Sequence, residues 1–231
     1  MQNKSICIIP ARGGSKRIPR KNIKEFCGKP IIAYSIEVAL KSRLFDEVMV
    51  STDDEEIAEI ATSYGANVPF MRSANTSDDY ATTAEVLLEV LEKYQTLYNK
   101  TYEIGCCIYA CAPLIKQTKL IESHQKLVSE GLDSVFPVAE YSTPIRRAIS
   151  LNDKDQVSFI FKENELVRSQ DLETAYFDTG QYYWFNIQAF KQNKQLISSN
   201  SKAIILSALQ AQDIDNEEDW VLAELKFQIS N

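Results

Sequence analysis

Hydrophobic and polar positions alternate in two patterns along the first two-thirds of this 231-residue chain. Short apolar runs predict five buried strands, at 5–9, 47–51, 67–70, 104–109 and 134–138. Segments with apolar residues at helical spacing predict four amphipathic helices, at 30–42, 54–64, 83–98 and 116–129. This alternation of strands and helices predicts an α/β fold, with a mostly parallel sheet that carries helices on both faces.

The pattern changes after about residue 142. Two short strands, at 147–151 and 157–161, flank a polar turn and predict a β-hairpin that interrupts the α/β alternation. An aromatic strand follows at 182–187, and a helix at 217–229 closes the chain. We therefore expect a single domain over residues 1–231, with residues 142–184 as an inserted arm that packs on another subunit.

A basic loop follows the first predicted strand. Before Glu25 it contains no carboxylate and six cations: Arg12, Lys16, Arg17, Arg20, Lys21 and Lys24. The whole chain has a formal net charge of −7, so this loop stands out as a local site for a polyanion. Gly13 and Gly14 support that interpretation, because residues without a Cβ let backbone N–H groups approach an anion closely.

The position of the basic loop favours a polyphosphate as the polyanion. Ligands of open α/β sheets bind beyond the carboxyl ends of the strands, where this loop lies. Its glycines have the wrong spacing for a P-loop, and a dinucleotide fingerprint would need a third glycine well before Gly28. The alternative is a solvated surface loop, but Pro10 and Pro19 stiffen the segment, which a mere linker does not require.

Composition narrows the class of protein. No apolar run approaches the roughly 18 residues that span a bilayer, and the acidic balance disfavours nucleic-acid binding, so we expect neither a membrane nor a nucleic-acid partner. Five cysteines, three of them close together around one strand, indicate reduced thiols and a cytoplasmic location. The single histidine, His124, argues against a zinc site or a Ser–His triad, and we expect it to pack or to lie on the surface.

Asp213-Ile214-Asp215 is the second candidate for chemistry. In an extended segment the side chains at i and i+2 face the same way, so both carboxylates project together while Ile214 packs behind them. Paired carboxylates beside a triphosphate suit Mg²⁺, which prefers oxygen ligands from one or two carboxylates, phosphates and water. The alternative is an acidic turn that caps the last helix.

The run at 9–22, Ile-Pro-Ala-Arg-Gly-Gly-Ser-Lys-Arg-Ile-Pro-Arg-Lys-Asn, closely resembles the first motif of the CMP-sialic acid synthetase (acylneuraminate cytidylyltransferase) family. Residues 28–30 and 51–53 extend this resemblance, which spans nearly the whole chain. It implies a Rossmann-like nucleotidyltransferase fold, with a sugar's anomeric hydroxyl attacking the α-phosphorus of CTP and pyrophosphate leaving. Catalysis of this kind rests on positioning and charge neutralisation.

The resemblance also assigns residues to CTP. The expected nucleotide-binding residues are Arg12, Gly13, Gly14, Ser15, Lys21, Asn22, Arg72, Thr82 and Thr83. Among them Arg12, Ser15 and Lys21 match positions on the triphosphate. Arg72, Thr82 and Thr83 match positions that line a cytosine pocket. Without the resemblance, Arg72 reads as a surface residue, and Asp53 as a helix cap. The family carries an Asp-x-Asp metal pair before its last helix, which favours Mg²⁺ at Asp213 and Asp215, and we expect these two carboxylates, with Arg12 and Lys21, to be catalytic.

The sugar end departs from the N-acetylneuraminate enzymes, which carry Gln-Pro-Thr-Ser-Pro where residues 109–113 are Tyr-Ala-Cys-Ala-Pro. Residues 143–147, 168–172 and 176–184 instead resemble the pseudaminic acid branch of the family, which acts on a 5,7-diamino nonulosonate. The expected substrate-binding residues are Tyr109, Arg146, Arg168, Gln170, Asp178 and Gln181. The resemblance implies that the two arginines reach the substrate carboxylate across a homodimer interface, and guanidinium suits a carboxylate. The alternative for Arg146 is that it and Arg147 only decorate an exposed hairpin. Tyr182, Tyr183 and Trp184 are expected in an interface and the core, in preference to a platform for the sugar.

Together these observations predict a cytoplasmic, Mg²⁺-dependent cytidylyltransferase that uses CTP and a nonulosonic acid, pseudaminic acid above all, as a homodimer. CMP-legionaminate and CMP-N-acetylneuraminate synthesis are alternatives with the same chemistry. An alternative of another class is a non-catalytic, nucleotide-binding regulatory module, against which the complete basic loop and both carboxylates argue.

Overall fold

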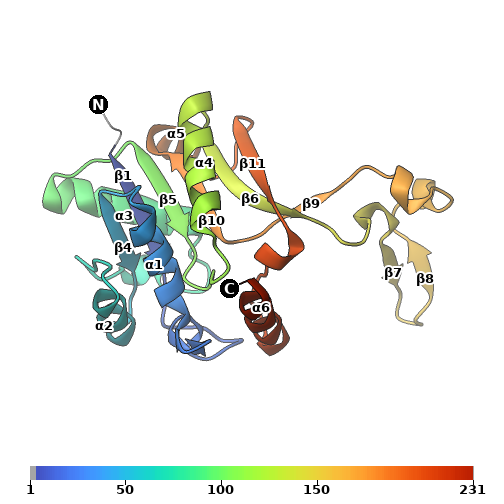
Figure 1. Cartoon of the computed structure of the whole chain (residues 1–231), viewed down its shortest axis with the longest axis horizontal. Helices are drawn as coiled ribbons and strands as arrows, with labels where there is room; N and C mark the ends of the chain where they lie inside the picture. Colours follow the sequence, from blue (N-terminus) through green and yellow to red (C-terminus); the bar gives the residue numbers. More distant parts are fainter. Residues whose placement is uncertain (1–3, 231) are drawn as a thin grey trace.

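The computed structural model describes residues 4–230, and within them seven strands form one mixed sheet in the order β11-β6-β10-β5-β1-β4, with β9 paired to β6 (Figure 1). These strands are β1 (Ser5–Pro10), β4 (Glu47–Ser51), β5 (Ile104–Ile108), β6 (Ser134–Glu140), β9 (Tyr176–Asp178), β10 (Tyr182–Asn186) and β11 (Ser201–Leu206). Two smaller pairs are β2 (Glu25–Phe26) with β3 (Lys29–Pro30), and β7 (Ile149–Leu151) with β8 (Val157–Phe159).

Strand β1 is parallel to both β4 and β5, so the carboxyl ends of these three strands meet at one edge of the sheet. Strand β10 runs antiparallel between β5 and β6, and β11 is parallel to β6. The predicted strand at 67–70 is wrong, because only Asn67 forms an isolated bridge, to Met49. Pro69 follows two residues later and has no N–H with which to continue a ladder.

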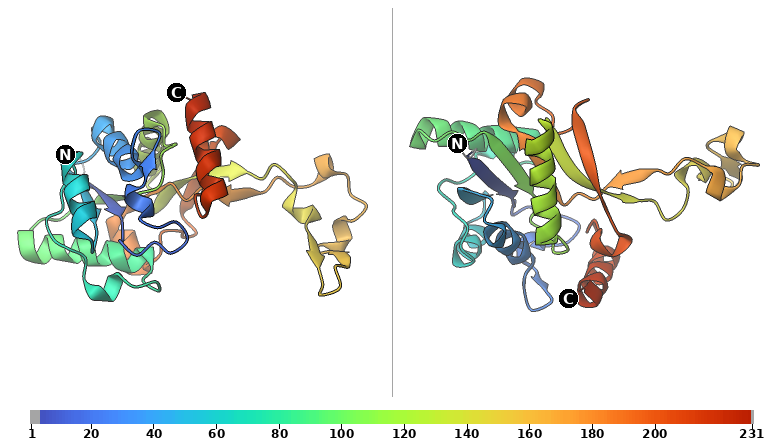
Figure 2. Two further views of the ribbon diagram at one scale, coloured as in Figure 1. Left: turned by 90° about the horizontal axis from the view of Figure 1, so that it is seen from below. Right: turned by 45° about the horizontal axis from the view of Figure 1, so that its top comes forward.

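Helices cover both faces of the sheet, as the alternation predicted (Figures 1 and 2). They are α1 (Ile31–Ser42), α2 (Glu55–Ser63), α3 (Thr83–Tyr98), α4 (Gln117–Glu130), α5 (Ile187–Asn193) and α6 (Glu217–Ser230). Apolar residues of α1, α2 and α4 share one buried cluster with the sheet, and those of α3 and α5 share another. The α/β fold class is thus confirmed. Helix α5 and strand β11 were not predicted. Helix α5 has only seven residues, too few to show a clear helical period in the sequence.

The aromatic strand β10 alternates between the two faces of the sheet. Trp184 stacks on Phe45 at 4.9 Å between ring centroids and donates from Nε1 to the Leu120 carbonyl at 3.1 Å. His124 packs on the same indole ring at 4.7 Å, and burial lowers its pKa. The packing role expected for His124 is therefore confirmed, and so is the core role of Trp184.

The arm leaves the sheet after β6 and returns through β9. In all three ribbon views the segment that carries β7 and β8 projects away from the body of the molecule (Figures 1 and 2). The predicted hairpin is confirmed, with Ile149 opposite Phe159 and Leu151 opposite Val157. Its first strand begins two residues later than predicted, because a 3₁₀ turn occupies residues 145–147.

Gly105 gives a test of packing in the centre of the sheet. It lies on β5 opposite Phe185 of β10, and a Cβ at this position would collide with the Phe185 ring, which is fully packed. We expect Gly105→Ala to lower the free energy of unfolding by about 1–3 kcal/mol, because the core must shift to accept the methyl group. Urea denaturation measures the change, and an unaltered midpoint would show that the ring moves freely.

Candidate active site

Two adjoining cavities open at the edge where β1, β4 and β5 end, each with a volume of about 410 Å³. The first, here the loop cavity, is lined mainly by the basic loop together with Arg72, Thr83 and Val86. The second, here the carboxylate cavity, is lined by Cys111, Asp178, Gly180, Tyr183, Asp213 and Ile214. Both cavities share a common wall, made of Pro10, Lys21, Asn22 and Tyr109. One continuous site therefore joins the basic loop to the acidic segment.

Apolar packing brings these two segments, nearly 200 residues apart in the sequence, into contact. Ile18 of the basic loop and Ile214 of the acidic segment lie in one buried cluster with Trp220 of α6. Polar contacts reinforce the packing, since Lys21 Nζ donates to the Ile214 carbonyl at 2.7 Å and Arg17 pairs with Asp215 at 2.7 Å. The fold thus holds the cationic and the anionic half of the site together.

The geometry of the acidic segment decides between its two interpretations. Ile214 is only 2% exposed, as the spacing predicted, and packs in the cluster with Ile18. Asp213 lines the carboxylate cavity, whereas Asp215 pairs with Arg17 and lines neither cavity. Capping of α6 is done by other residues, because the Asp219 carboxylate accepts from the N–H groups of Asp215 and Asn216 at 3.0 and 3.1 Å. Asn216 accepts in turn from the Asp219 N–H at 3.0 Å. The carboxylates of Asp213 and Asp215 are therefore not needed as caps.

The electrostatics of Asp213 suit a cation. Burial, and then repulsion from Asp215, raises the pKa of Asp213 above its ordinary value. Within residues 4–230 no three His, Cys, Asp or Glu side chains are grouped as a metal site, so the protein itself offers two carboxylates at most. That donor set fits Mg²⁺, which completes its shell with phosphate oxygens and water, and Asp213 and Asp215 are the residues that would hold it.

The six loop cations divide into two groups. Arg20 and Lys24 support the structure, since Arg20 pairs with Asp54 and Glu56, and Lys24 with Glu217. The other four line the loop cavity: Arg12, Lys16, Arg17 and Lys21. The sequence analysis named only the first and the last of these as site residues.

The two loop glycines differ in their surroundings. The Gly13 N–H donates to the Asp53 carboxylate at 3.0 Å, and a Cβ at Gly13 would lie 2.7 Å from an Asp54 oxygen. Gly13 is therefore required for close packing against the start of α2, which Asp54 caps by accepting from the Ile57 N–H. No atom lies within 4 Å of the Cβ position of Gly14, so that position is open.

On the side predicted to bind the base, Arg72 and Thr83 line the loop cavity and Thr82 does not. Arg72 is no loose surface residue, because it donates from Nε to Ser51 Oγ at 3.1 Å and from Nη2 to the Ser51 carbonyl at 2.5 Å. Burial lowers its pKa. Thr82 forms a capping box with Glu85 at the start of α3. This structural role accounts for a threonine at position 82 without any contact to a ligand.

Tyr109 stands at the junction of the two cavities. Its hydroxyl lies 2.7 Å from Thr83 Oγ1, and burial raises its pKa to about 12. Tyr183 packs edge-on against it at 6.0 Å between ring centroids and donates to the Asp178 carboxylate at 2.5 Å. Tyr183 is buried, as the sequence analysis expected, and it also lines the carboxylate cavity, which the sequence analysis did not predict. The alternation of side chains along β10 could have indicated this role, since Tyr183 points to the opposite face of the sheet from its neighbours Tyr182 and Trp184.

Four predicted sugar-site residues do not reach the cavities within one chain. Arg146 pairs with Glu173 at 2.5 Å and Arg168 with Asp171 at 2.7 Å, all on the projecting arm, which also carries Gln170. Gln181 is buried, and its side-chain amide donates to the Gln210 carbonyl. This contact links β10 to the segment that leads to Asp213.

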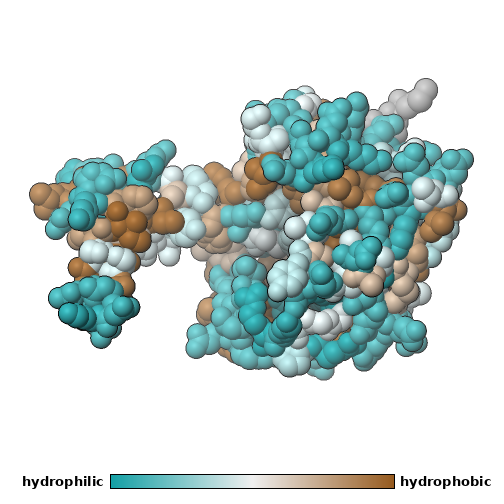
Figure 3. Space-filling view, turned by 180° about the vertical axis from the view of Figure 1, so that it is seen from behind, coloured by the Kyte–Doolittle hydropathy of each residue, from teal (hydrophilic) through white to brown (hydrophobic). Residues whose placement is uncertain are grey.

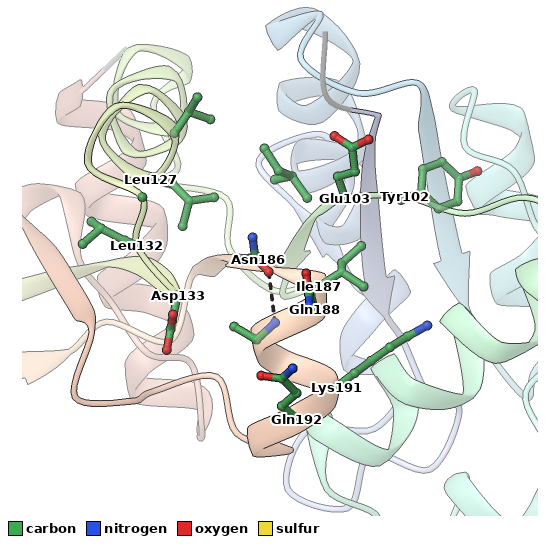
Figure 4. A pocket seen from close by; sticks show the side chains of 14 residues that line it. Tyr102, Glu103, Leu127, Leu132, Asp133, Asn186, Ile187, Gln188, Lys191 and Gln192 are labelled. Atoms are coloured by element: carbon green, nitrogen blue, oxygen red, sulfur yellow. Dashed lines mark hydrogen bonds between the residues drawn. The ribbon is translucent and has the colours of Figure 1, made fainter. Parts of the chain in front are cut away.

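A larger cavity, of about 880 Å³, lies elsewhere (Figure 4). It opens at the amino end of β5, the opposite edge of the sheet, where Asn186 caps α5 by accepting from the Ala189 N–H at 3.0 Å. None of the predicted nucleotide, sugar or metal residues lines it. Size alone therefore does not identify the site.

A cationic loop and a carboxylate pair that meet at the carboxyl edge of an α/β sheet define the class of nucleotidyltransferases. Comparison with known proteins narrows this class: the sequence profile of the Cytidylyltransferase family matches residues 6–226. The chain belongs to this family of enzymes.

Individual relatives agree with this assignment. A pseudaminic acid cytidylyltransferase of Campylobacter jejuni is 42% identical over 228 residues, which cover 99% of this chain and 98% of that protein. A CMP-N,N'-diacetyllegionaminic acid synthase of Legionella pneumophila is 29% identical over 97% of each chain. A CMP:2-keto-3-deoxy-manno-octonic acid synthetase, solved with CTP, shares the fold with a TM-score of 0.69 at 19% identity over 98% of each chain.

Proposed function

We propose that this enzyme transfers CMP from CTP to the anomeric hydroxyl of pseudaminic acid, giving CMP-pseudaminic acid and pyrophosphate. The observation that carries the proposal is the continuous site, in which the loop cavity and the carboxylate cavity meet at Lys21 and Tyr109. A nucleotide and an acceptor bound in adjoining cavities can react directly where the cavities join. The choice of pseudaminic acid rests on the full-length similarity to the Campylobacter jejuni relative.

The loop cavity would hold the nucleotide. Arg72 and Thr83 line the loop cavity but not the carboxylate cavity and would face the cytosine, while Arg12, Ser15 and Lys21 would bind the triphosphate. The Asn22 side chain holds the loop in shape by donating to the Arg12 carbonyl at 2.9 Å. Lys21, at the common wall, stands nearest to the α-phosphorus in this arrangement and would neutralise charge that develops there.

Asp213 and Asp215 would hold Mg²⁺, which supplies charge neutralisation to the triphosphate when bound. The Lys21 ammonium fixes the backbone between the two carboxylates through the Ile214 carbonyl, so it orients the metal site as well as the phosphates. Neither cavity contains a histidine, and the only thiol, Cys111, has its pKa raised to about 12 by burial. Direct attack by the sugar hydroxyl, without a covalent protein intermediate, suits this set of residues.

The carboxylate cavity would hold the sugar acid. The Asp178 carboxylate is fixed by Tyr183 and by the Gly180 N–H at 3.0 Å, so it can accept from an amide N–H or a hydroxyl of the sugar. We further propose a homodimer in which the arm of a second copy brings Arg146, Arg168 and Gln170 to the sugar. Guanidinium groups from that arm would bind the substrate carboxylate in the bidentate geometry.

The surface of the arm supports the dimer. Figure 3 shows apolar surface on the projecting arm. Its exposed apolar side chains include Ile149, Leu151, Val157, Ile160 and Leu166, the last of them 96% exposed. An apolar patch of this kind on a segment that stands away from its own body is typical of a protein interface.

We expect Leu151→Glu combined with Leu166→Glu to convert the dimer into monomers and to lower turnover at least about tenfold, because charged residues would enter the apolar contact. Sedimentation velocity measures the first effect and pyrophosphate release the second. Lys154→Ala, on the polar turn between β7 and β8, is the control and should leave both unchanged. A fully active monomer would exclude a role in trans for the arm.

A cytoplasmic location is also proposed. All five cysteines are free thiols, and burial raises the pKa of Cys7, Cys106 and Cys107, which suits a reducing compartment. No helix within residues 4–230 has the length and apolar character needed to cross a membrane.

Legionaminic acid is the second candidate acceptor, favoured by the similarity to the Legionella pneumophila synthase. N-acetylneuraminic acid is disfavoured, because Tyr109 replaces the glutamine of those enzymes. Mass spectrometry of the products formed from CTP, Mg²⁺ and each acid tests the proposal. A CMP-pseudaminic acid product supports the proposal. A product from another acid alone would show that the acceptor is that acid and not pseudaminic acid.

A further inference from the structure

A single carboxylate, Asp79, binds two of the cations that line the loop cavity. One oxygen of Asp79 accepts from Arg12 Nη1 at 2.6 Å, and the other pairs with the Lys16 ammonium. Arg12 Nη1 also donates to the Asp78 carbonyl at 3.2 Å. Residues 78 and 79 belong to the loop before α3, nearly 70 residues from the cations they contact.

The loop that carries Asp79 is itself fixed. The Asp78 carboxylate accepts from the N–H groups of Tyr80 and Ala81 at 3.0 and 2.7 Å, which closes a tight turn beside Asp79. The capping box of Thr82 and Glu85 then anchors the end of this loop to α3. The loop that positions Asp79 is therefore held by its own hydrogen bonds, which do not involve the cations.

The Glu89 carboxylate of α3 holds the turn at residues 73–76, which directly follows Arg72 in the sequence. Burial would raise the pKa of Glu89, but hydrogen bonds from Lys93, Thr76 and Ser73 hold it at about 2. The whole segment between Arg72 and Thr83 is thus braced at both ends by carboxylates of α3.

The contacts of Arg12 leave part of its guanidinium available. Its backbone carbonyl is fixed by Asn22, and Nη1 is taken by residues 78 and 79. A guanidinium has five N–H donors in a rigid fork, so the donors on Nε and Nη2 remain for a ligand. Arg12 also lines the loop cavity beside Arg72 and Thr83.

We propose that Asp79 is a positioning residue for the triphosphate, which orients Arg12 and Lys16 so that their remaining donors face the phosphates. Asp79 would also couple the two halves of the nucleotide site, because its loop leads into the base-side residue Thr83 at the start of α3 and its carboxylate holds the phosphate-side cations. The inference rests on the proposed use of CTP.

The proposal predicts an effect on binding and not on folding. Asp79 and Arg12 are each 37% exposed, and an ion pair between exposed groups contributes little to stability. The two cations hold the pKa of Asp79 below its ordinary value, so the carboxylate is charged at neutral pH and Asp79→Asn removes that charge without changing the shape. Asp79→Glu keeps the charge and should recover part of the lost function.

The experiment compares Asp79→Asn, Asp79→Glu and the wild type by calorimetric binding of CTP, CMP and inorganic tripolyphosphate, and by the KM and kcat for CTP. Glu130→Gln is the matched control, because Glu130 pairs with Lys202, is also 37% exposed and lies away from both cavities. We expect Asp79→Asn to weaken CTP and tripolyphosphate binding about 5- to 20-fold and to raise the KM for CTP, with kcat within about threefold. CMP binding should stay within about twofold, because CMP lacks the outer phosphates.

Tighter binding of tripolyphosphate by Asp79→Asn would overturn the proposal, because Asp79 would then compete with the phosphates for the cations. Unchanged binding would overturn it as well and leave a surface ion pair without function. Failure of the proposed function looks different: the wild type would then release no pyrophosphate with any sugar acid, whatever Asp79 does to tripolyphosphate binding.

Discussion

Replacing Asp213 and Asp215 by asparagine together is expected to abolish turnover, with a loss of at least about 10³-fold in kcat. The fold holds these two carboxylates beside the basic loop, through Ile214 packing and the Lys21 contact. In the proposed function these carboxylates would hold Mg²⁺, so the variant would leave the triphosphate without that neutralising charge, while the cavities keep their shape.

The same variant should fold normally. Burial and repulsion from Asp215 raise the pKa of Asp213, so its charged form costs stability at neutral pH, and removal of the charge does not destabilise the protein. A Tm equal to or above that of the wild type, with lost pyrophosphate release, is the expected pair of results. Glu218→Gln, in the first turn of α6, is the control for a nearby negative charge and should leave activity unchanged. Normal turnover in the double variant would remove the metal role from this segment.

Replacing Lys21 by methionine is expected to lower kcat/KM for CTP about 10²- to 10³-fold. Lys21 lines both cavities and donates to the Ile214 carbonyl at 2.7 Å, so its loss removes a charge at the reacting centre and loosens the acidic segment. Methionine preserves the length and the apolar contacts of the side chain, which separates the charge from packing.

Steady-state kinetics with varied CTP and varied Mg²⁺ measures both consequences of this change. We expect a lower kcat and a higher Mg²⁺ requirement, and Lys21→Arg should recover part of the loss because the charge returns. Lys24→Met removes a cation of the same loop that pairs with Glu217 outside both cavities, so it serves as the control. Equal kinetics for Lys21→Met and the wild type would contradict the placement of Lys21 at the junction.

Local patterns explain why much of the fold was predictable. The predicted bounds of α3, Thr83 and Tyr98, are confirmed. The structure shows their local cause, since Thr82 and Glu85 form a capping box and Asn99 ends the helix in the left-handed conformation. The antiparallel place of β10 between β5 and β6 was not predictable, since strand partners are chosen by distant segments. The failed strand at 67–70 shows the same limit, because Pro69 stops a ladder that the apolar run alone would favour.

The site residues also divide into those that local sequence predicts and those that only the fold reveals. The basic loop and Asp213-Ile214-Asp215 are short motifs whose residue types alone indicate their chemistry, and the fold brings them together. Tyr183 was missed because burial and site lining look alike in an aromatic run, and Thr82 was assigned to a pocket although it caps a helix. Asp79 and Arg17 act through contacts across more than 60 residues, which no local pattern contains.

The most direct test of the central claim is pyrophosphate release from CTP and Mg²⁺, with pseudaminic, legionaminic and N-acetylneuraminic acids offered in parallel. We predict rapid release with pseudaminic acid and release at least about tenfold slower with the other two. Turnover with another acid alone would support the cytidylyltransferase activity and contradict the choice of pseudaminic acid as the acceptor. No release with any acid, while CTP still binds, would contradict the account and favour a non-catalytic nucleotide-binding module.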